Sequence, residues 1–261
     1  MAQTTTAPME EATGPAAIRR IGFADIRAAL AKGREDFMAK PSHMVFLSII
    51  YPLVALIASR LTFGYDILPL LFPLCAGFSL VGPVAAIGLY EISRERENGQ
   101  QPSWQHAFKV VRSPGLQAVG QMALILAAIF LLWLLAAHLV YTVTIGDVPG
   151  SVGGFLNAVF TTPGGWALIV VGNAIGLLFA IVVLIISVVS VPMILDRHVS
   201  VGTAIRTSVA AVRRNPVTMA GWGLTVAVML VIGAIPAFVG LAITVPILGH
   251  ATWHLYRRTV S

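Results

Sequence analysis

The stretch 118–143, AVGQMALILAAIFLLWLLAAHLVYTV, decides the fold class, because it contains no Asp, Glu, Lys or Arg. A helix needs about 20 mostly apolar residues to cross roughly 30 Å of hydrocarbon at 1.5 Å per residue. A second stretch of this kind follows at 166–195, WALIVVGNAIGLLFAIVVLIISVVSVPMIL. The two stretches predict helices that cross a lipid bilayer.

The composition of the whole chain supports this prediction. Of its 261 residues, 57% are apolar and 11% are charged, and the mean hydropathy is +0.86. Soluble domains are usually about 45–50% apolar and about 25% charged. This chain has too few polar residues to cover a water-facing surface, which excludes a soluble enzyme, a disordered protein and a coiled coil. Its single cysteine excludes a disulfide scaffold and a Cys-based metal site.

Six apolar runs are long enough to cross the membrane, so we expect an all-α, polytopic membrane protein. The last two runs are separated only by Pro236, but one helix over both would be about 60 Å long, twice the hydrocarbon thickness. Residues 1–20 are expected to form a disordered tail without a cleavable signal peptide, and residues 21–258 a single six-span domain. The predicted spans are 44–63, 67–90, 118–143, 166–195, 217–235 and 237–256.

The positions of the basic residues predict the orientation. Lys and Arg prefer the cytoplasmic side of a membrane. With six crossings and the N-terminus inside, 16 of the 17 Lys and Arg residues lie on that side, and only Arg60 lies outside. A five-crossing chain would export Arg257 and Arg258, so we expect both termini in the cytoplasm. The net charge of +6 is spread over short segments between spans, which favours lipid headgroups over nucleic acid as partners.

The runs form three hairpins, each preceded by a short cytoplasmic stretch with helical apolar spacing. Each stretch ends at an X-Pro step, where the residue before proline is pushed out of the α region. We expect three amphipathic surface helices and an internal repeat. The apolar faces are Ile26, Leu30 and Phe37; Trp104, Phe108 and Val111; and Ile205, Val209 and Val212; the steps are Lys40-Pro41, Ser113-Pro114 and Asn215-Pro216.

The second span of each hairpin carries a proline toward its inner end, at Pro83, Pro192 and Pro246. A proline leaves one helix carbonyl without its usual donor. We interpret the three prolines as helix kinks; the alternative is that they mark a cavity facing the cytoplasm.

Small residues on the fourth span predict close helix packing. Gly172 and Gly176 form a G-x-x-x-G pattern, and Asn173 beside them can hydrogen-bond across a helix contact. Packing within the chain is favoured over a homodimer interface. In the outer loop 144–165, the apolar residues Phe155 and Leu156 belong to a short helix expected on the outer leaflet, with a substrate lid as the alternative.

No Asp, Glu, Lys or Arg lies centrally in any predicted span, which argues against ion-coupled transport and leaves no paired carboxylates for hydrolysis. His250 and His254 have the i, i+4 spacing of an H-x-x-x-H metal pair, but Ala251 stands where a metalloprotease has glutamate. Two imidazoles leave a metal ion incompletely coordinated, and further ligands would have to come from Glu91 or His43. We interpret the two histidines as interfacial residues, so no metal, cofactor or catalytic residue is expected.

At Pro192–Arg197 (PMILDR), Asn215-Pro216 and Leu248–Arg257 (LGHATWHLYR), the chain resembles an uncharacterised bacterial family of predicted integral membrane proteins, a domain of unknown function. The resemblance extends over most of the chain from about residue 20 onward. It implies a six-helix protein of the bacterial inner membrane and supplies no catalytic residues. Some members carry a provisional label as cytochrome c oxidase subunits.

Three functions remain open. The first is a non-catalytic component, or an assembly or accessory factor, of a membrane complex, with the bilayer and other membrane subunits as partners. The second is a transporter of a small molecule or lipid. The third is a redox accessory subunit related to a respiratory oxidase, with haem or copper on His250 and His254.

Overall fold

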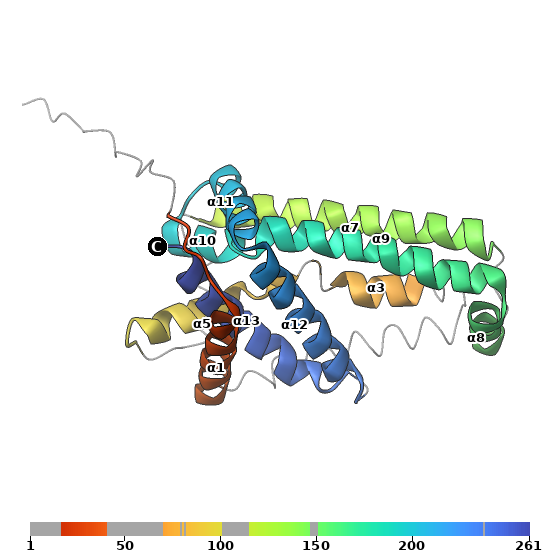
Figure 1. Cartoon of the computed structure of the whole chain (residues 1–261), viewed down its shortest axis with the longest axis horizontal. Coiled ribbons are helices and arrows are strands. Elements are labelled where there is room, and N and C mark those ends of the chain that lie inside the picture. The colour runs from red at the N-terminus through yellow and green to blue at the C-terminus, as the bar shows by residue number, and fades with distance from the viewer. Residues whose placement is uncertain are drawn as a thin grey trace, which may run out of the picture.

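The computed structural model describes residues 17–40, 70–78, 80, 82–100, 115–146, 151–236 and 238–261. Within these ranges the chain is all-helical apart from one isolated antiparallel bridge between Ile18 and Val260 (Figure 1). The helices are α1 (Phe23–Ala39), α3 (Leu71–Phe78), α4 (Gly82–Ala85), α5 (Ile87–Glu97), α7 (Leu116–Thr144), α8 (Val152–Thr161), α9 (Pro163–Ser187), α10 (Ser190–Arg197), α11 (Val201–Arg214), α12 (Pro216–Ala234) and α13 (Leu241–Thr259).

Three helical segments of the described chain are long and apolar enough to cross a membrane: α7, α9 together with α10, and α12. They match the third, fourth and fifth predicted spans to within a few residues. At most 33% of the most apolar window of each segment is buried inside the protein. The remaining surface is apolar, for example at Leu131 and Leu177, and therefore faces lipid.

The arrangement of six spans as three hairpins is not confirmed. The first predicted span, 44–63, lies outside the described residues. The second, 67–90, is interrupted where it is described, because α3, α4 and α5 follow one another as separate helices. The sixth, 237–256, corresponds to α13, but this helix ends in polar and charged residues and its inner half is buried. The structure therefore supports an all-helical membrane protein with three long apolar helices.

Two of the three prolines lie just after a helix break. The break between α9 and α10 includes Val188, the residue four positions before Pro192. A proline ring collides with the carbonyl at position i−4 and cannot donate to it, which explains why the helix is interrupted there. Pro83 likewise lies in α4, after the break that follows α3. Pro246 lies inside α13, which continues past it.

The helices α7 and α9 lie side by side, with α8 at one end of the pair and α10 and α11 at the other (Figure 1). The helix α8 lies in the segment 144–165, where the sequence predicts a short helix. Its Phe155 ring contacts Tyr141 of α7 at a centroid distance of 6.3 Å, while Leu156 and Phe160 are exposed. The end of the molecule that carries α1, α5, α10 and α11 contains most of the charged residues and corresponds to the predicted cytoplasmic side.

The helices α1 and α11 correspond to the first and third predicted surface helices, and the second, with Trp104, Phe108 and Val111, lies outside the described residues. On α11, Ile205 and Val212 are half-buried and pack against the core. The buried face of α1 is more polar than expected. It consists of Ile26, Ala29, Gly33, Asp36 and Phe37.

Helix α1 crosses α13 at Gly33. A Cβ atom at this position would lie 2.7 Å from the backbone nitrogen of Ala251 and 2.7 Å from the backbone oxygen of Ile247. Real Cβ atoms do not approach backbone so closely, so the crossing requires glycine. This close approach brings the last turn of α1 onto the inner half of α13.

The segment 17–21 pairs with the C-terminus. Arg19 N donates to Thr259 O at 2.8 Å, and Ser261 N donates to Ala17 O at 3.0 Å. Residues 17–20, which the sequence analysis assigns to the N-terminal tail, therefore lie against the end of α13.

Candidate functional site

Helices α1, α5 and α13 bring five polar side chains together at the charged end of the molecule, which is predicted to be cytoplasmic. His250 and His254 lie one turn apart on α13, and Ser93 and Arg96 lie one turn apart on α5. The fifth is Asp36, which α1 can place here because Gly33, one turn earlier, lets the two helices touch. We call these five residues the Asp36 cluster.

The carboxylate of Asp36 is the centre of the cluster. Its Oδ2 accepts hydrogen bonds from Ser93 Oγ at 2.7 Å and from His254 Nε2 at 2.7 Å, and its Oδ1 lies 2.8 Å from Arg96 Nε. Ser93 Oγ also lies 2.8 Å from His250 Nδ1. With the Ser93 proton donated to Asp36, His250 must donate its Nδ1 proton to Ser93. A continuous chain of hydrogen bonds thus joins the two histidines through Ser93 and Asp36.

Three members of the cluster are buried, whereas the side chains of His254 and Arg96 are 14% and 30% exposed. Asp36 is 4% exposed, and Ser93 and His250 are 0% exposed. Burial by itself raises the pKa of the Asp36 carboxyl, but the hydrogen bonds from His254 and Ser93 and the nearby imidazoles outweigh it and lower the pKa below its ordinary value. Asp36 is therefore a buried anion that pairs with the positive charge of Arg96.

This geometry differs from that of a Ser-His-Asp hydrolase. In a hydrolase triad, the serine hydroxyl donates to the histidine, which then accepts its proton. Here Ser93 donates to the carboxylate, so its proton is not available to a neighbouring base. The arrangement can stabilise the contact between three helices and can pass a proton along the hydrogen-bonded chain, but it does not activate Ser93 as a nucleophile.

A second polar network lies beside the cluster and joins α13 to α5 and α10. Trp253 Nε1 and Arg257 Nε both donate to Glu97, at 3.0 and 3.1 Å. Tyr256 Oη donates to Asp196 at 2.7 Å, and Arg257 contacts the same carboxylate at 3.4 Å. The inner end of α13 is thus held on both sides by carboxylates from other helices.

The partners of the two histidines differ from those that the sequence predicts. Glu91, one of the two candidate helpers for a metal site, pairs with Arg94 at 2.7 Å, and His43 lies outside the described residues. The carboxylate that actually faces the histidines is Asp36, which the sequence analysis missed. Its signal was an acidic residue on the apolar face of an amphipathic helix, three positions after Gly33. In the described part of the chain, no three His, Cys, Asp or Glu residues are placed to hold a metal ion.

Gly172, Asn173 and Gly176 of the fourth span line a groove. Only Gly176 of the two glycines lies close to another described helix. Gly176 approaches the Trp133 ring of α7, with a Cβ position 3.0 Å from the nearest ring atom. At Gly172 only Leu168 of the same helix lies within 4 Å. The side chain of Asn173 donates to Ile169 O of its own helix at 2.7 Å. The groove has a volume of about 310 Å³ and lies among α3, α7, α9 and α12.

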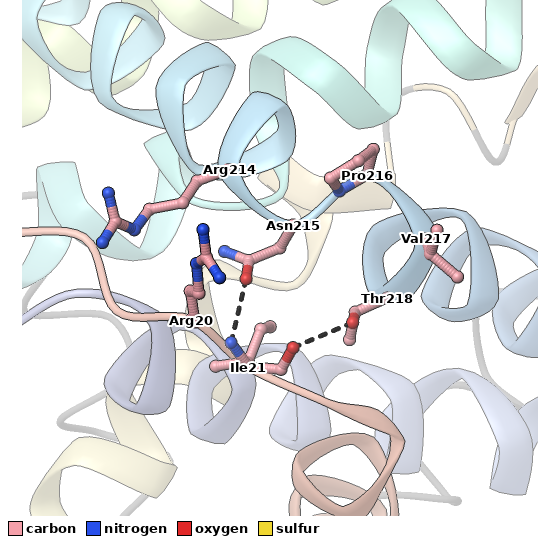
Figure 2. A pocket seen from close by; sticks show the side chains of 7 residues that line it. All are labelled: Arg20, Ile21, Arg214, Asn215, Pro216, Val217 and Thr218. Atoms are coloured by element: carbon pink, nitrogen blue, oxygen red, sulfur yellow. Dashed lines mark hydrogen bonds between the residues drawn. The ribbon is translucent and has the colours of Figure 1, made fainter.

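A second hollow, of about 230 Å³, lies where the segment 19–21 meets the junction of α11 and α12 (Figure 2). Asn215 fixes this junction, because its side chain accepts from Ile21 N at 2.9 Å and donates to Arg19 O at 3.0 Å. Thr218 adds a hydrogen bond to Ile21 O at 2.9 Å. The hollow is lined by Arg20, Ile21, Arg214, Asn215, Pro216, Val217 and Thr218.

Comparison with protein families gives one match. Residues 71–196 match the model of a family described as "Predicted integral membrane protein (DUF2189)", whose function is unknown. The matched range runs from α3 to α10 and includes Pro192–Asp196, but Asn215-Pro216 and Leu248–Arg257 lie outside it. The resemblance to an uncharacterised membrane protein family is confirmed over this range. No curated protein and no solved structure matches the chain.

Proposed function

We propose that this chain, an integral membrane protein similar to DUF2189 over residues 71–196, is a non-catalytic component or assembly factor of a membrane complex. In this proposal the chain lies in the bacterial inner membrane, crosses it six times and keeps both termini in the cytoplasm. The three hairpins are repeats of one unit, and the partners are other membrane subunits.

The observation that supports this role is the groove at Gly172. Within the described residues, no atom of another helix lies within 4 Å of a Cβ atom at Gly172, so the backbone there is open to a second helix, as small residues are in membrane helix pairs. Asn173, on the same face and exposed, offers an amide to a partner once its own-helix bond is exchanged. The ionisable groups of α5, α10 and the end of α13, by contrast, are engaged in ion pairs within the protein, which favours a structural role for them.

The test is a tagged pull-down from membranes in mild detergent. We expect partner subunits to co-purify with the wild-type chain and to be lost from the Gly172→Leu variant, because leucine fills the backbone approach. Gly120→Leu on α7 is the matched control, since no other described helix lies within 4 Å of a Cβ atom at either position and Gly120 is outside the groove. A wild-type chain that purifies alone, or equal loss of partners from both variants, would contradict the proposal.

A transporter of a small molecule or lipid is the second candidate. The observation that favours it is the interrupted course of α3, α4 and α5, together with the groove of about 310 Å³ beside α3. Broken helices are common at transporter binding sites. A substrate-dependent rise in the unfolding temperature of the purified chain would favour this candidate. A redox accessory subunit is the third candidate and is decided by an absorption spectrum.

A further inference from the structure

Two arginines without acidic partners face the hollow between residues 19–21 and the α11–α12 junction. Within the described residues, every arginine of α5, α10 and α13 has a carboxylate within 4 Å: Arg94, Arg96, Arg197, Arg257 and Arg258. No carboxylate of the described chain lies at that distance from Arg20 or Arg214. Figure 2 shows both guanidinium groups on the same side of Asn215. Two like charges brought to one hollow attract an anion that the protein itself does not supply.

The backbone that holds these arginines is fixed from within the protein. Asn215 is 5% exposed and bonds to both Ile21 N and Arg19 O, so the segment carrying Arg20 is held against the residue that follows Arg214. The two charges are therefore brought together by a buried hydrogen-bonded contact. Helix α12 begins at this hollow, and the positive end of its dipole adds to the potential there without defining the site.

The depth of the hollow indicates the source of the anion. It lies at the start of α12, one of the three helices long and apolar enough to cross the membrane. Helix α11, immediately before it, presents Arg206 and Arg213 on its exposed side. The hollow thus lies at the level where the polar headgroups of the inner leaflet meet the hydrocarbon. Its volume of about 230 Å³ is below the roughly 300–1,000 Å³ of pockets for drug-sized ligands and suits a phosphate ester.

We infer that the hollow formed by Arg20, Arg214 and the start of α12 binds the phosphate of an anionic phospholipid of the inner leaflet. One guanidinium group can donate two parallel hydrogen bonds to two oxygens of a phosphate. Basic pockets beside membrane helices on the cytoplasmic side bind anionic headgroups. The bound lipid would fix the N-terminal segment to the inner end of α12.

The test measures lipid selectivity of the full-length protein in phosphatidylcholine bilayers, by electron spin resonance with spin-labelled phosphatidylglycerol and spin-labelled phosphatidylcholine. We expect the wild type to prefer phosphatidylglycerol, and the preference to fall by roughly fivefold or more in R20Q/R214Q. The matched control is R206Q/R213Q, which removes the same charge from α11 outside the hollow and should keep most of the preference. No preference in the wild type, or an equal fall in both double variants, would overturn the site.

Two further measurements keep the result decisive. If R20Q/R214Q does not fold, R20K/R214K replaces it. Lysine keeps the charge but lacks the planar guanidinium that binds two phosphate oxygens, so the preference for phosphatidylglycerol should still fall. An unchanged preference in R20K/R214K would overturn the site. Millimolar inorganic phosphate distinguishes the two sources of phosphate. Displacement of the phosphatidylglycerol label by inorganic phosphate, with a higher unfolding temperature in lipid-free detergent, would assign the hollow to free phosphate and refute the lipid.

Discussion

Asp36 Oδ2 lies 2.7 Å from His254 Nε2, although 218 residues separate the two in sequence. The contact joins α1 to α13, and Ser93 and Arg96 of α5 bond to the same carboxylate. Because Asp36 is buried, these bonds replace its hydration completely. The stability of the contact between α1, α5 and α13 should therefore depend on this one carboxylate.

The first prediction is that Asp36→Asn strongly destabilises the protein. The change removes the buried carboxylate that Arg96 and His254 contact, and breaking a buried pair by removing one partner costs about 3–5 kcal/mol. For a chain of this size we expect the unfolding temperature in neutral detergent to fall by roughly 6–20 °C. The control is Glu35→Gln, next in the chain, because its side chain is 59% exposed and pairs with Lys32 on the surface of the same helix. Equal stability of the two variants would contradict the central role of Asp36.

The second prediction concerns acid. The pKa of the Asp36 carboxyl is lower in the folded protein than its ordinary value of 3.8, so the folded state binds this proton less readily than the unfolded state. The stability that the carboxylate contributes is then complete above pH 3.8 and is lost as the pH falls from there through the folded pKa. Thermal unfolding followed at decreasing pH should show this loss in the wild type and a shallower loss in Asp36→Asn. Parallel curves for the two proteins would exclude Asp36 as the titrating group.

The third prediction tests the crossing of α1 and α13. Gly33→Ala places a Cβ atom 2.7 Å from the backbone of Ala251, so the helices must separate. Overpacking of this kind costs about 1–3 kcal/mol and should lower the unfolding temperature. Gly202→Ala in α11 is the same substitution where nothing lies within 4 Å, and it should leave stability unchanged or slightly higher. A Gly33→Ala protein as stable as Gly202→Ala would show that the helices do not touch at this point.

The long apolar helices could be predicted from sequence because their signal is local. The runs 118–143 and 217–235 match α7 and α12 to within two residues, since about 20 apolar residues have few other stable arrangements. The X-Pro step at Lys40-Pro41 similarly located the end of α1. The interruption of the second span was missed. The sequence places three prolines in it, at Pro69, Pro73 and Pro83, but it did not show that the helix would break before Pro83 and again at Ala86.

The polar sites could not be predicted for a different reason. Asp36 and His254, or Arg20 and Arg214, come from segments that are distant in sequence and meet only through tertiary packing. Periodicity could show that Asp36 shares a helix face with Ile26 and Phe37, but it could not identify which helix covers that face. The i, i+4 spacing of His250 and His254 could be seen in the sequence. The hydrogen bonds that join the two histidines through Ser93 and Asp36 could not, because they form only where α1 crosses α13 at Gly33.

The fourth prediction is the membrane orientation. A reporter that is active only outside the cytoplasm should be silent when fused after Arg258 and active when inserted near Asp147. The physical reason is the cytoplasmic preference of Lys and Arg, and Arg257 and Arg258 pair with carboxylates of α1, α5 and α10 on the same side. An active fusion after Arg258, or a silent insertion near Asp147, would refute six crossings with both ends inside.

The fifth prediction is that His250 and His254 bind no redox cofactor. A haem held by two imidazoles normally takes them from opposite faces of the ring, whereas these two lie one turn apart on α13 and point the same way, about 5–6 Å apart at Cβ. Each imidazole also has a protein partner: Ser93 lies 2.8 Å from His250 Nδ1, and Asp36 lies 2.7 Å from His254 Nε2. A metal at His254 Nε2 would have to displace the bond that joins α13 to α1.

The purified protein should therefore be colourless, with no Soret band and no stoichiometric copper by elemental analysis. His250→Ala should leave the absorption spectrum unchanged and act on stability alone, because it removes a fully buried side chain and leaves Ser93 with Asp36 as its remaining partner. His138, on the exposed side of α7, is the control histidine, and its replacement should change neither property. A Soret band that disappears in His250→Ala would reverse this conclusion. It would require α1 to move away from α13 in the cofactor-bound protein, and it would make the redox accessory subunit the best-supported of the three functions.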